Sequence, residues 1–225
     1  MPYEDPEDFA GRMAEKSIAV GDPTGWFEQV YAAAEVGQTE VPWDRQAPSP
    51  FLVQWARQCG LNGAGRRALV VGCGLGDDAE FIAGLGFQTV AFDIAPTAIA
   101  TARRRFPGSP VQYRTANLLD PPPDWYRAFD LVVESLTLQA LPDPPRRDAI
   151  GRVGDLVAPG GTLIVIARAS EEGESVQGPP WALARSEIDS LGQTGLEQVR
   201  IEDMRDTALP WPRRWRAEFR RPSAN

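Results

Sequence analysis

A single unit spanning residues 66–93 constrains this chain most, because it joins a strand, a glycine turn, a helix and a second strand in that order. The apolar run 68–71 leads into glycines at positions 72, 74 and 76, and a later strand ends at Asp93. Glycines let the backbone pass close to a ligand. Asp93 follows Gly72 by 21 residues, near the spacing at which a carboxylate bonds ribose hydroxyls. The unit predicts a site for a ligand that contains adenosine.

The sixth loop position separates the possible ligands. A dinucleotide-binding loop has glycine there, whereas this chain has Asp77, whose carboxylate would repel a pyrophosphate at the helix N-terminus. No Gly-Lys-Ser/Thr sequence follows that would form a phosphate-binding loop. S-adenosylmethionine fits better, because it has a ribose and positive charge but no phosphate. Two alternatives are a tight turn with no ligand and an NAD-dependent oxidoreductase, which Asp77 disfavours.

The rest of the chain alternates strand and helix patterns. With 225 residues, 43% of them hydrophobic, it fits one α/β domain with a mainly parallel sheet covered on both faces. Strands are expected at 68–71, 88–92, 111–114, 129–134, 162–167, 197–202 and 214–220. Helices are expected at 25–35, 51–58, 77–85, 95–105, 145–157 and 183–193. We divide the chain into an N-terminal arm and helical cap segment, 1–60, and a core, 61–225, with residues 1–20 expected to be a mobile or lightly packed acidic arm.

Composition excludes several classes of function. No apolar run approaches the roughly 20 residues that span a bilayer, and the acidic N-terminus does not resemble a signal peptide, so we expect a cytoplasmic protein without a membrane partner. A net charge of −8 argues against a nucleic-acid partner. Cys59 and Cys73 lack a metal-ligand spacing, so no metal is expected. Without histidine, proton transfer must use Asp, Glu, Tyr, Cys, Lys or water.

Two further strand ends carry candidate binding residues. Ligands of open parallel sheets bind beyond the carboxyl ends of the strands. Asn117 and Leu118 follow the third strand, where they could contact an adenine edge and ring, although Asn117 also fits an Asx-turn. Glu134 and Ser135 end the fourth strand, and we expect both to face the same crevice. A solvated strand-end carboxylate is the alternative for Glu134.

Together these motifs resemble the class I S-adenosylmethionine-dependent methyltransferases. The resemblance rests on residues 71–76, Asp93, residues 129–132 and residues 158–161, and covers roughly residues 25–220. It implies a Rossmann-like three-layer sandwich with a seven-stranded sheet whose last strand is antiparallel, and an N-terminal helical lid. It also implies S-adenosyl-L-methionine as the cofactor and S-adenosyl-L-homocysteine as the product. The implied cofactor-binding residues are Gly72, Cys73, Gly74, Gly76, Asp93, Ile94, Asn117, Leu118, Glu134 and Trp43.

Three aromatic segments resemble the branch of thiopurine and halide or thiocyanate methyltransferases. They are the helix with Trp26, Phe27 and Tyr31, the loop Pro42-Trp43-Asp44, and the segment 178–181, Gly-Pro-Pro-Trp. In that branch these segments cover the cofactor and wall the acceptor pocket. The resemblance therefore implies Trp26, Tyr31 and Trp181 as substrate-binding residues, whereas helical spacing alone also fits a packing face for Trp26 and Tyr31.

Methyl transfer from a sulfonium is an in-line displacement, so positioning supplies much of the rate. A thiolate or a halide needs little help from a base, whereas a hydroxyl does. We expect a small-molecule acceptor of the thiol or halide type, with Glu134, Asp44 and Tyr31 as candidate bases if one is used. The alternatives are an O- or N-methyltransferase of secondary metabolism and a non-catalytic S-adenosylmethionine-binding protein. We expect a monomer or homodimer.

Overall fold

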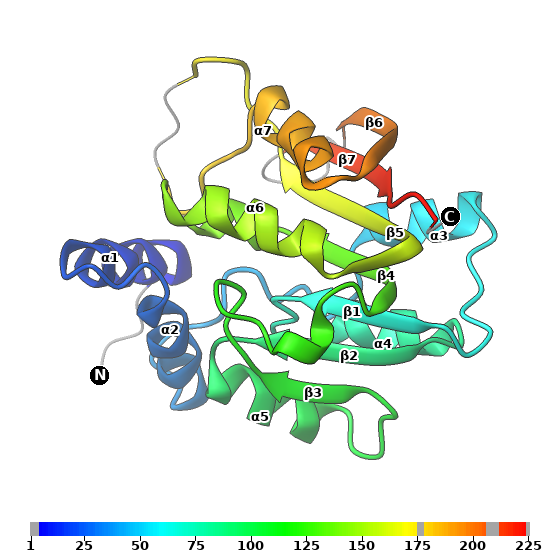
Figure 1. Cartoon of the computed structure of the whole chain (residues 1–225). Helices are drawn as coiled ribbons and strands as arrows, with labels where there is room; N and C mark the ends of the chain where they lie inside the picture. Colours follow the sequence, from blue (N-terminus) through cyan, green and yellow to red (C-terminus); the bar gives the residue numbers. More distant parts are fainter. Residues whose placement is uncertain (1–4, 175–177, 206–211, 224–225) are drawn as a thin grey trace.

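A seven-stranded sheet with helices on both faces forms the centre of the computed structural model, which describes residues 5–174, 178–205 and 212–223 (Figure 1). The strand order is β3-β2-β1-β4-β5-β7-β6. The strands are β1 Arg67–Val71, β2 Gln88–Asp93, β3 Gln112–Thr115, β4 Phe129–Ser135, β5 Val157–Arg168, β6 Glu197–Arg205 and β7 Arg213–Arg220. The α-helices are α1 Pro6–Ala19, α2 Gly25–Glu35, α3 Pro50–Gln58, α4 Asp77–Gly84, α5 Pro96–Arg105, α6 Pro145–Asp155 and α7 Arg185–Asp189. The 3₁₀ helices are η1 Pro123–Trp125, η2 Leu138–Ala140 and η3 Ser190–Thr194.

Strand directions confirm the predicted three-layer sandwich. β1 pairs in parallel with β2 and β4, β2 with β3, and β4 with β5. β7 is antiparallel to both of its neighbours, β5 and β6. Strand order reverses between β1 and β4, and ligands of open α/β sheets bind at the carboxyl edge beside such a reversal. The glycine loop after β1 therefore opens at the edge where a binding site is expected.

Two hydrophobic cores separate the sheet from its helices. α3, α4 and α5 cover one face, with Trp55, Ile82 and Ile99 packed against Val70 and Leu131. α6, α7, η2 and η3 cover the other face, where the core includes Phe129 and Phe219. Strands buried on both faces read as continuous apolar runs, as residues 68–71 do. α3 thus packs on the sheet and not with the N-terminal helices.

The expectation of a mobile arm over residues 1–20 is wrong for its described part, because residues 6–19 form α1. The Asp5 side chain caps this helix, its Oδ1 accepting from the backbone N–H groups of Glu7 at 3.0 Å and Asp8 at 3.2 Å. Such caps, with acidic residues in the first turn, stabilise a helix N-terminus. The buried Ala10 and Ala14 pack in a cluster with residues of α2. The acidity that suggested an arm is the start signal of a helix.

Two core elements differ in extent from expectation. β5 begins at Val157, whereas a strand was expected only from residue 162, and its register with β4 shifts over residues 158–161. Gly160 adopts a φ of 76° there. The helix expected over 183–193 divides into α7 and η3. Among the described residues, no helix is long and apolar enough to cross a membrane.

Candidate functional site

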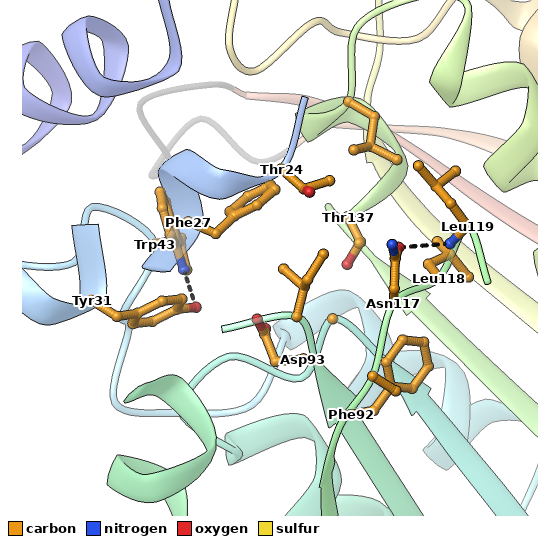
Figure 2. A pocket seen from close by; sticks show the side chains of 14 residues that line it. Thr24, Phe27, Tyr31, Trp43, Phe92, Asp93, Asn117, Leu118, Leu119 and Thr137 are labelled. Atoms are coloured by element: carbon orange, nitrogen blue, oxygen red, sulfur yellow. Dashed lines mark hydrogen bonds between the residues drawn. The ribbon is translucent and has the colours of Figure 1, made fainter. Parts of the chain in front are cut away.

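The first of three adjoining hollows, which we call the ribose cavity, lies at the carboxyl edge of the sheet. It encloses about 610 Å³, counting the part open to solvent. Figure 2 shows Tyr31 and Trp43 on one side, Asn117 and Leu118 on the other, and Asp93 between them. Its lining residues are Thr24, Phe27, Tyr31, Trp43, Gly72, Phe92, Asp93, Ile94, Ala116, Asn117, Leu118, Leu119, Thr137 and Leu141. Ligand pockets of several hundred Å³ with mainly apolar walls and few polar groups are typical of small-molecule sites.

Two glycines of the loop have no room for a side chain. Gly72 has a φ of 56°, and a Cβ on it would lie 2.2 Å from Thr137 Oγ1. A Cβ on Gly76, whose φ is 100°, would lie 2.5 Å from the Tyr113 hydroxyl. Positive φ and close contact both require glycine. The loop therefore presents backbone, as the sequence predicted.

Asp93 ties the end of β2 to this loop. Its Oδ2 accepts a hydrogen bond of 3.0 Å from Gly74 N–H, and its Oδ1 accepts one of 3.0 Å from Ala95 N–H. The side chain is buried, and burial raises its pKa to about 6 although these bonds oppose the shift. Since Asp93 also lines the ribose cavity, its carboxylate is positioned to accept hydrogen bonds from hydroxyl groups inside it.

Asn117 forms the Asx-turn and lies at the wall of the ribose cavity, and its contact with an adenine stays a prediction. Its Oδ1 accepts from Leu119 N–H at 2.9 Å, which is the bond of an Asx-turn, and its side chain also lines the ribose cavity (Figure 2). Leu118 and Ile94 line the same cavity. The turn fixes the Asn117 amide at the wall.

A second hollow, the acidic cavity, continues past the glycine loop and shares Gly72 and Trp43 with the first. It is lined by Asp44, Arg45, Cys73, Gly74, Asp77, Asp78 and Ser135 among others. Arg105 pairs with Asp44 at 3.1 Å and with Asp77 at 3.3 Å. Burial raises the pKa of Asp77 and of Asp78. These carboxylates can offer negative potential to a cationic ligand group.

Trp43 joins the cavities. Its indole Nε1 donates to the Tyr31 hydroxyl at 2.8 Å, and its ring meets those of Trp26 and Phe27 edge-on. It lines the ribose cavity, the acidic cavity and a third hollow. Burial and the nearby Asp93 carboxylate raise the pKa of Tyr31 well above its usual value, so its hydroxyl stays protonated at neutral pH and does not act as a base in that form.

The third hollow, the aromatic cavity, encloses about 1060 Å³ including its open part. Its lining residues are Glu7, Ala10, Trp26, Phe27, Pro42, Trp43, Arg45, Leu136, Gln139, Ala140, Arg168, Pro179, Pro180 and Arg214. The Gln139 side chain is fixed, because its Oε1 accepts from Arg168 N–H at 2.6 Å. Trp43 and Phe27 separate this cavity from the ribose cavity.

Glu134 was predicted to face the crevice, but the structure places it elsewhere. Its side chain is fully buried and lines none of the three cavities in the described structure. Its Oε1 accepts from Thr137 N–H at 2.7 Å and Leu138 N–H at 2.9 Å, so it caps η2. Burial raises its pKa to about 7. Its neighbour Ser135 does line the acidic cavity.

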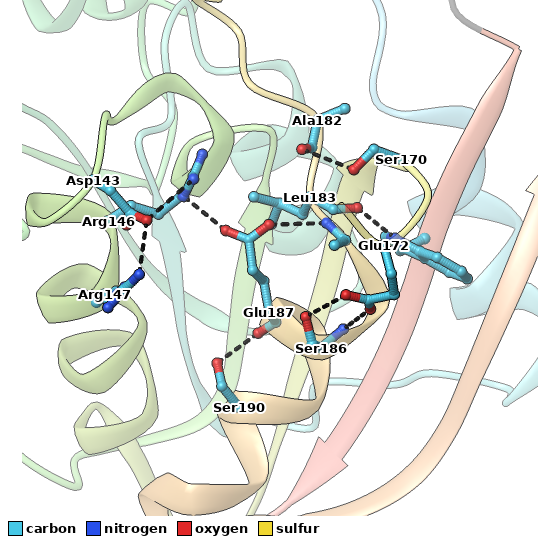
Figure 3. A network of polar contacts seen from close by, with 12 residues as sticks. Asp143, Arg146, Arg147, Ser170, Glu172, Ala182, Leu183, Ser186, Glu187 and Ser190 are labelled. Atoms are coloured by element: carbon cyan, nitrogen blue, oxygen red, sulfur yellow. Dashed lines mark hydrogen bonds and ion pairs between the residues drawn. The ribbon is translucent and has the colours of Figure 1, made fainter. Parts of the chain in front are cut away.

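Trp181 also lies apart from the other predicted residues. Its backbone N–H donates to Gln139 C=O at 2.7 Å, but its side chain lines a separate hollow beside α6 and α7. Figure 3 shows the polar network there, in which Glu187 pairs with Arg146 at 3.0 Å and accepts from Ala184 N–H at 2.9 Å. This network anchors the segment after β5. Pro179 and Pro180 enter the aromatic cavity instead.

Sequence reasoning missed several lining residues. Thr137 and Leu141 reach the ribose cavity from either side of η2, and Arg168 and Arg214 reach the aromatic cavity from β5 and β7. Thr137 and Leu141 are a single polar and a single apolar residue after the fourth strand, and neither forms a sequence pattern that predicts a binding site. The arginines could have been suspected, since Arg168 ends an otherwise apolar strand and so lies at the carboxyl edge.

Comparison with known proteins gives a consistent result. A family model described as a methyltransferase domain matches residues 69–163. The probable thiol methyltransferase 2 of Arabidopsis thaliana is 31% identical over 173 residues, 75% of this chain and 74% of the plant protein. A ubiquinone biosynthesis O-methyltransferase of Xanthomonas axonopodis pv. citri (strain 306) is 33% identical over 132 residues, and the match spans 54% of that protein.

Solved structures share the fold. The N-methyltransferase NodS of Bradyrhizobium japonicum WM9, in complex with S-adenosyl-L-homocysteine, superposes with a TM-score of 0.63 at 24% identity. The superposition covers 81% of this chain and 92% of that chain. At this identity the likeness concerns the arrangement of the sheet and helices.

Proposed function

Because this chain belongs to the class I S-adenosylmethionine-dependent methyltransferases, we propose that it transfers a methyl group from S-adenosyl-L-methionine to a small-molecule nucleophile, with a thiol favoured over a hydroxyl. One observation carries the proposal: Trp43 and Phe27 form a common wall between the ribose cavity and the aromatic cavity. A donor in the first and an acceptor in the second would meet at this wall.

The chemistry of the first two cavities fits the cofactor. Asp93 suits ribose hydroxyls, while Asn117 and Leu118 suit the edge and face of adenine. Asp77 and Asp78 of the acidic cavity suit an ammonium group, since opposite charges attract strongly where water is partly excluded. The glycine backbone between them leaves space for the connecting chain. No phosphate is needed to explain any of these groups.

The protein's part in the reaction is to position two molecules and to exclude water. When bound, S-adenosylmethionine supplies a methyl group on a sulfonium, and the acceptor's lone pair forms the new bond as the sulfur–methyl bond breaks toward S-adenosylhomocysteine. Trp43 and Phe27 would hold the acceptor in line, and alignment is the largest contribution such a site can make. Their aromatic faces also suit a neighbouring cation.

The state of the three candidate bases favours a thiol. Tyr31 is held protonated, Asp44 is paired with Arg105, and Glu134 is buried under η2. A thiol that loses its proton to water near neutral pH needs none of them, whereas an alcohol would need one. Glu134, Asp44 and Tyr31 therefore become positioning residues in this proposal.

The second candidate is transfer to oxygen. It is favoured by the O-methyltransferase relatives, although the chain matches only about half of their length. Thiol transfer takes precedence, because the plant thiol methyltransferase matches 74% of its own length. The activities named here are those of the relatives, and for this chain they serve only to order the two candidate functions.

Calorimetric titration with S-adenosylmethionine, S-adenosylhomocysteine and NAD⁺ tests the cofactor. We expect micromolar binding of the first two and none of the third. Turnover is then measured with benzenethiol, thiocyanate and phenol in parallel. Methylation of phenol in preference to benzenethiol would reverse the order of the two candidates, and tight cofactor binding without any turnover would indicate a binding protein.

A further inference from the structure

Two arginine side chains lie opposite one another on the wall of the aromatic cavity. Arg168 is the last residue of β5 and pairs directly with Arg214 of β7 in the antiparallel register. Both line the cavity. Directly opposite residues project from the same face of a sheet with Cβ atoms about 4.5–5.5 Å apart, and like charges in such a pair are destabilising. This pair is therefore an arrangement that the sheet alone does not favour.

The surroundings of the pair make its positive charge more costly. Arg214 is only 5% exposed, and burial lowers the pKa of Arg168 although the carboxylate of Glu7 opposes that shift. Arg45 adds a third guanidinium to the described lining, against one carboxylate from Glu7. The chain as a whole carries a net charge of −8. Among the described lining residues of the aromatic cavity, positive side chains therefore outnumber negative ones in an otherwise acidic protein.

Aromatic and proline side chains line another part of the cavity. Trp26, Phe27, Pro179 and Pro180 line it. The Trp26 Nε1 atom is buried, and no acceptor in the described part of the chain lies within hydrogen-bond distance of it. Trp26 therefore brings an unsatisfied donor to the neighbourhood of the guanidinium groups. A volume of about 1060 Å³, open part included, also exceeds what a halide ion would fill.

We propose that the acceptor is an aromatic compound with a carboxylate, and that the Arg168–Arg214 pair binds this carboxylate. The inference rests on the proposed function, since it assigns the acceptor of that methyl transfer. Guanidinium groups bind carboxylates through paired, charge-assisted hydrogen bonds. A carboxylate between the two arginines would offset the like charges that the strand register brings together. The ring of the acceptor then lies against Trp26 and Phe27, and its nucleophile points toward Trp43.

Binding of two matched probes tests the carboxylate alone. The full chain, saturated with S-adenosylhomocysteine, is titrated with 4-mercaptobenzoate and with methyl 4-mercaptobenzoate, which share the ring and the thiol. We expect the acid to bind about tenfold tighter or more. Arg168→Gln should abolish this preference. Arg57→Gln removes the same charge from an exposed position of α3 and should leave the preference unchanged.

Folding of each variant is checked through its affinity for S-adenosylhomocysteine, which should be unaltered. Arg168→Lys keeps the charge without the planar fork, and it should retain part of the preference. Equal affinity of the acid and its ester in the unaltered chain would overturn the inference. So would an Arg168→Gln variant that still prefers the acid, or thiocyanate binding as tightly as 4-mercaptobenzoate.

Turnover separates this inference from the proposed function. If S-adenosylmethionine methylates the ester as efficiently as the acid, methyl transfer stands and the carboxylate assignment fails. If the acid binds preferentially and neither probe is methylated, the arginine pair stands as a carboxylate site, and transfer to thiols fails.

Discussion

The indole of Trp43 is fixed by Tyr31, whose hydroxyl accepts the Nε1–H bond at 2.8 Å. Tyr31 belongs to α2, and Trp43 to the loop that follows it. The bond crosses the wall between the cavities, and the Tyr31 hydroxyl also lies 3.1 Å from the position that a Cβ on Gly74 would occupy. A single phenol thus sets the orientation of the aromatic wall relative to the glycine loop.

Tyr31→Phe should loosen this wall. The substitution leaves the partly buried Trp43 Nε1 without its acceptor, which should lower the free energy of unfolding by about 1 kcal/mol. Turnover should fall more, on the order of tenfold, because the ring no longer has a fixed orientation. Urea unfolding and kcat are measured in parallel, with the exposed Tyr126→Phe as the control. Unchanged kcat would mean that Trp43 is held by packing alone.

Cofactor affinity should depend on pH through Asp93. Burial raises its pKa to about 6 in the free protein, so the carboxylate that would accept ribose hydroxyls is lost as pH falls through about 6. S-adenosylhomocysteine should therefore bind more weakly at about pH 5 than at about pH 8. Asp93→Asn should weaken binding by about 1.5–3 kcal/mol at the higher pH. Asp93→Asn should also flatten the pH dependence of S-adenosylhomocysteine binding. If the variant kept the original pH dependence, a group other than Asp93 would be responsible for it.

Glu134 should make the protein less stable as pH rises. Its pKa is raised from 4.5 to about 7 by burial, so the folded state binds more protons than the unfolded state between these values, and stability declines across that range. Asp93 acts in the same direction over the lower part of the range. Urea unfolding of Glu134→Gln between about pH 5 and pH 8 should show a flatter profile. The exposed Glu35→Gln is the control, and it should retain the original slope.

Gly72→Ala should impair both folding and binding. A φ of 56° and a Cβ 2.2 Å from Thr137 Oγ1 require the loop to move, and a left-handed non-glycine residue alone costs about 1–2 kcal/mol. We expect a lower Tm and weaker S-adenosylhomocysteine binding. Gly151→Ala in α6 meets nothing within 4 Å, and should instead raise stability by about 0.5–1 kcal/mol. If Gly72→Ala and Gly151→Ala changed stability and binding to a similar extent, the glycine loop would not be sterically constrained.

The core of the fold was readable from the sequence because its signals are local. The apolar run 68–71 ends at Gly72, and Pro96 begins α5 where it was expected. α1 was not predicted, because the acidic residues near the N-terminus were interpreted as a solvated arm. In the structure Asp5 caps the helix, and Glu7 and Asp8 lie in its first turn. β5 was predicted too short because Gly160 and Gly161, which usually mark a turn, here accompany a register shift inside the strand.

The site was predictable to the extent that strand ends determine it. Asp93 ends a strand, and Asn117 and Leu118 follow one, so their place at the carboxyl edge could be inferred. Whether a strand-end side chain points into the crevice or under the next turn depends on the turn, and this decided the position of Glu134. Trp181 instead lines the hollow beside α6 and α7, a position that no local pattern specifies. The opposed arginines depend on the register of β5 and β7, which no local pattern specifies.

The wall formed by Trp43 has a thermodynamic consequence for the order in which the two cavities fill. A ligand on either side that removes motion which the Tyr31 bond still leaves to the ring reduces the entropy that the second ligand must remove. Binding in one cavity should therefore favour binding in the other, and linkage requires the two enhancements to be equal. The same coupling applies to the two products after the reaction. Dissociation of one product should therefore speed dissociation of the other.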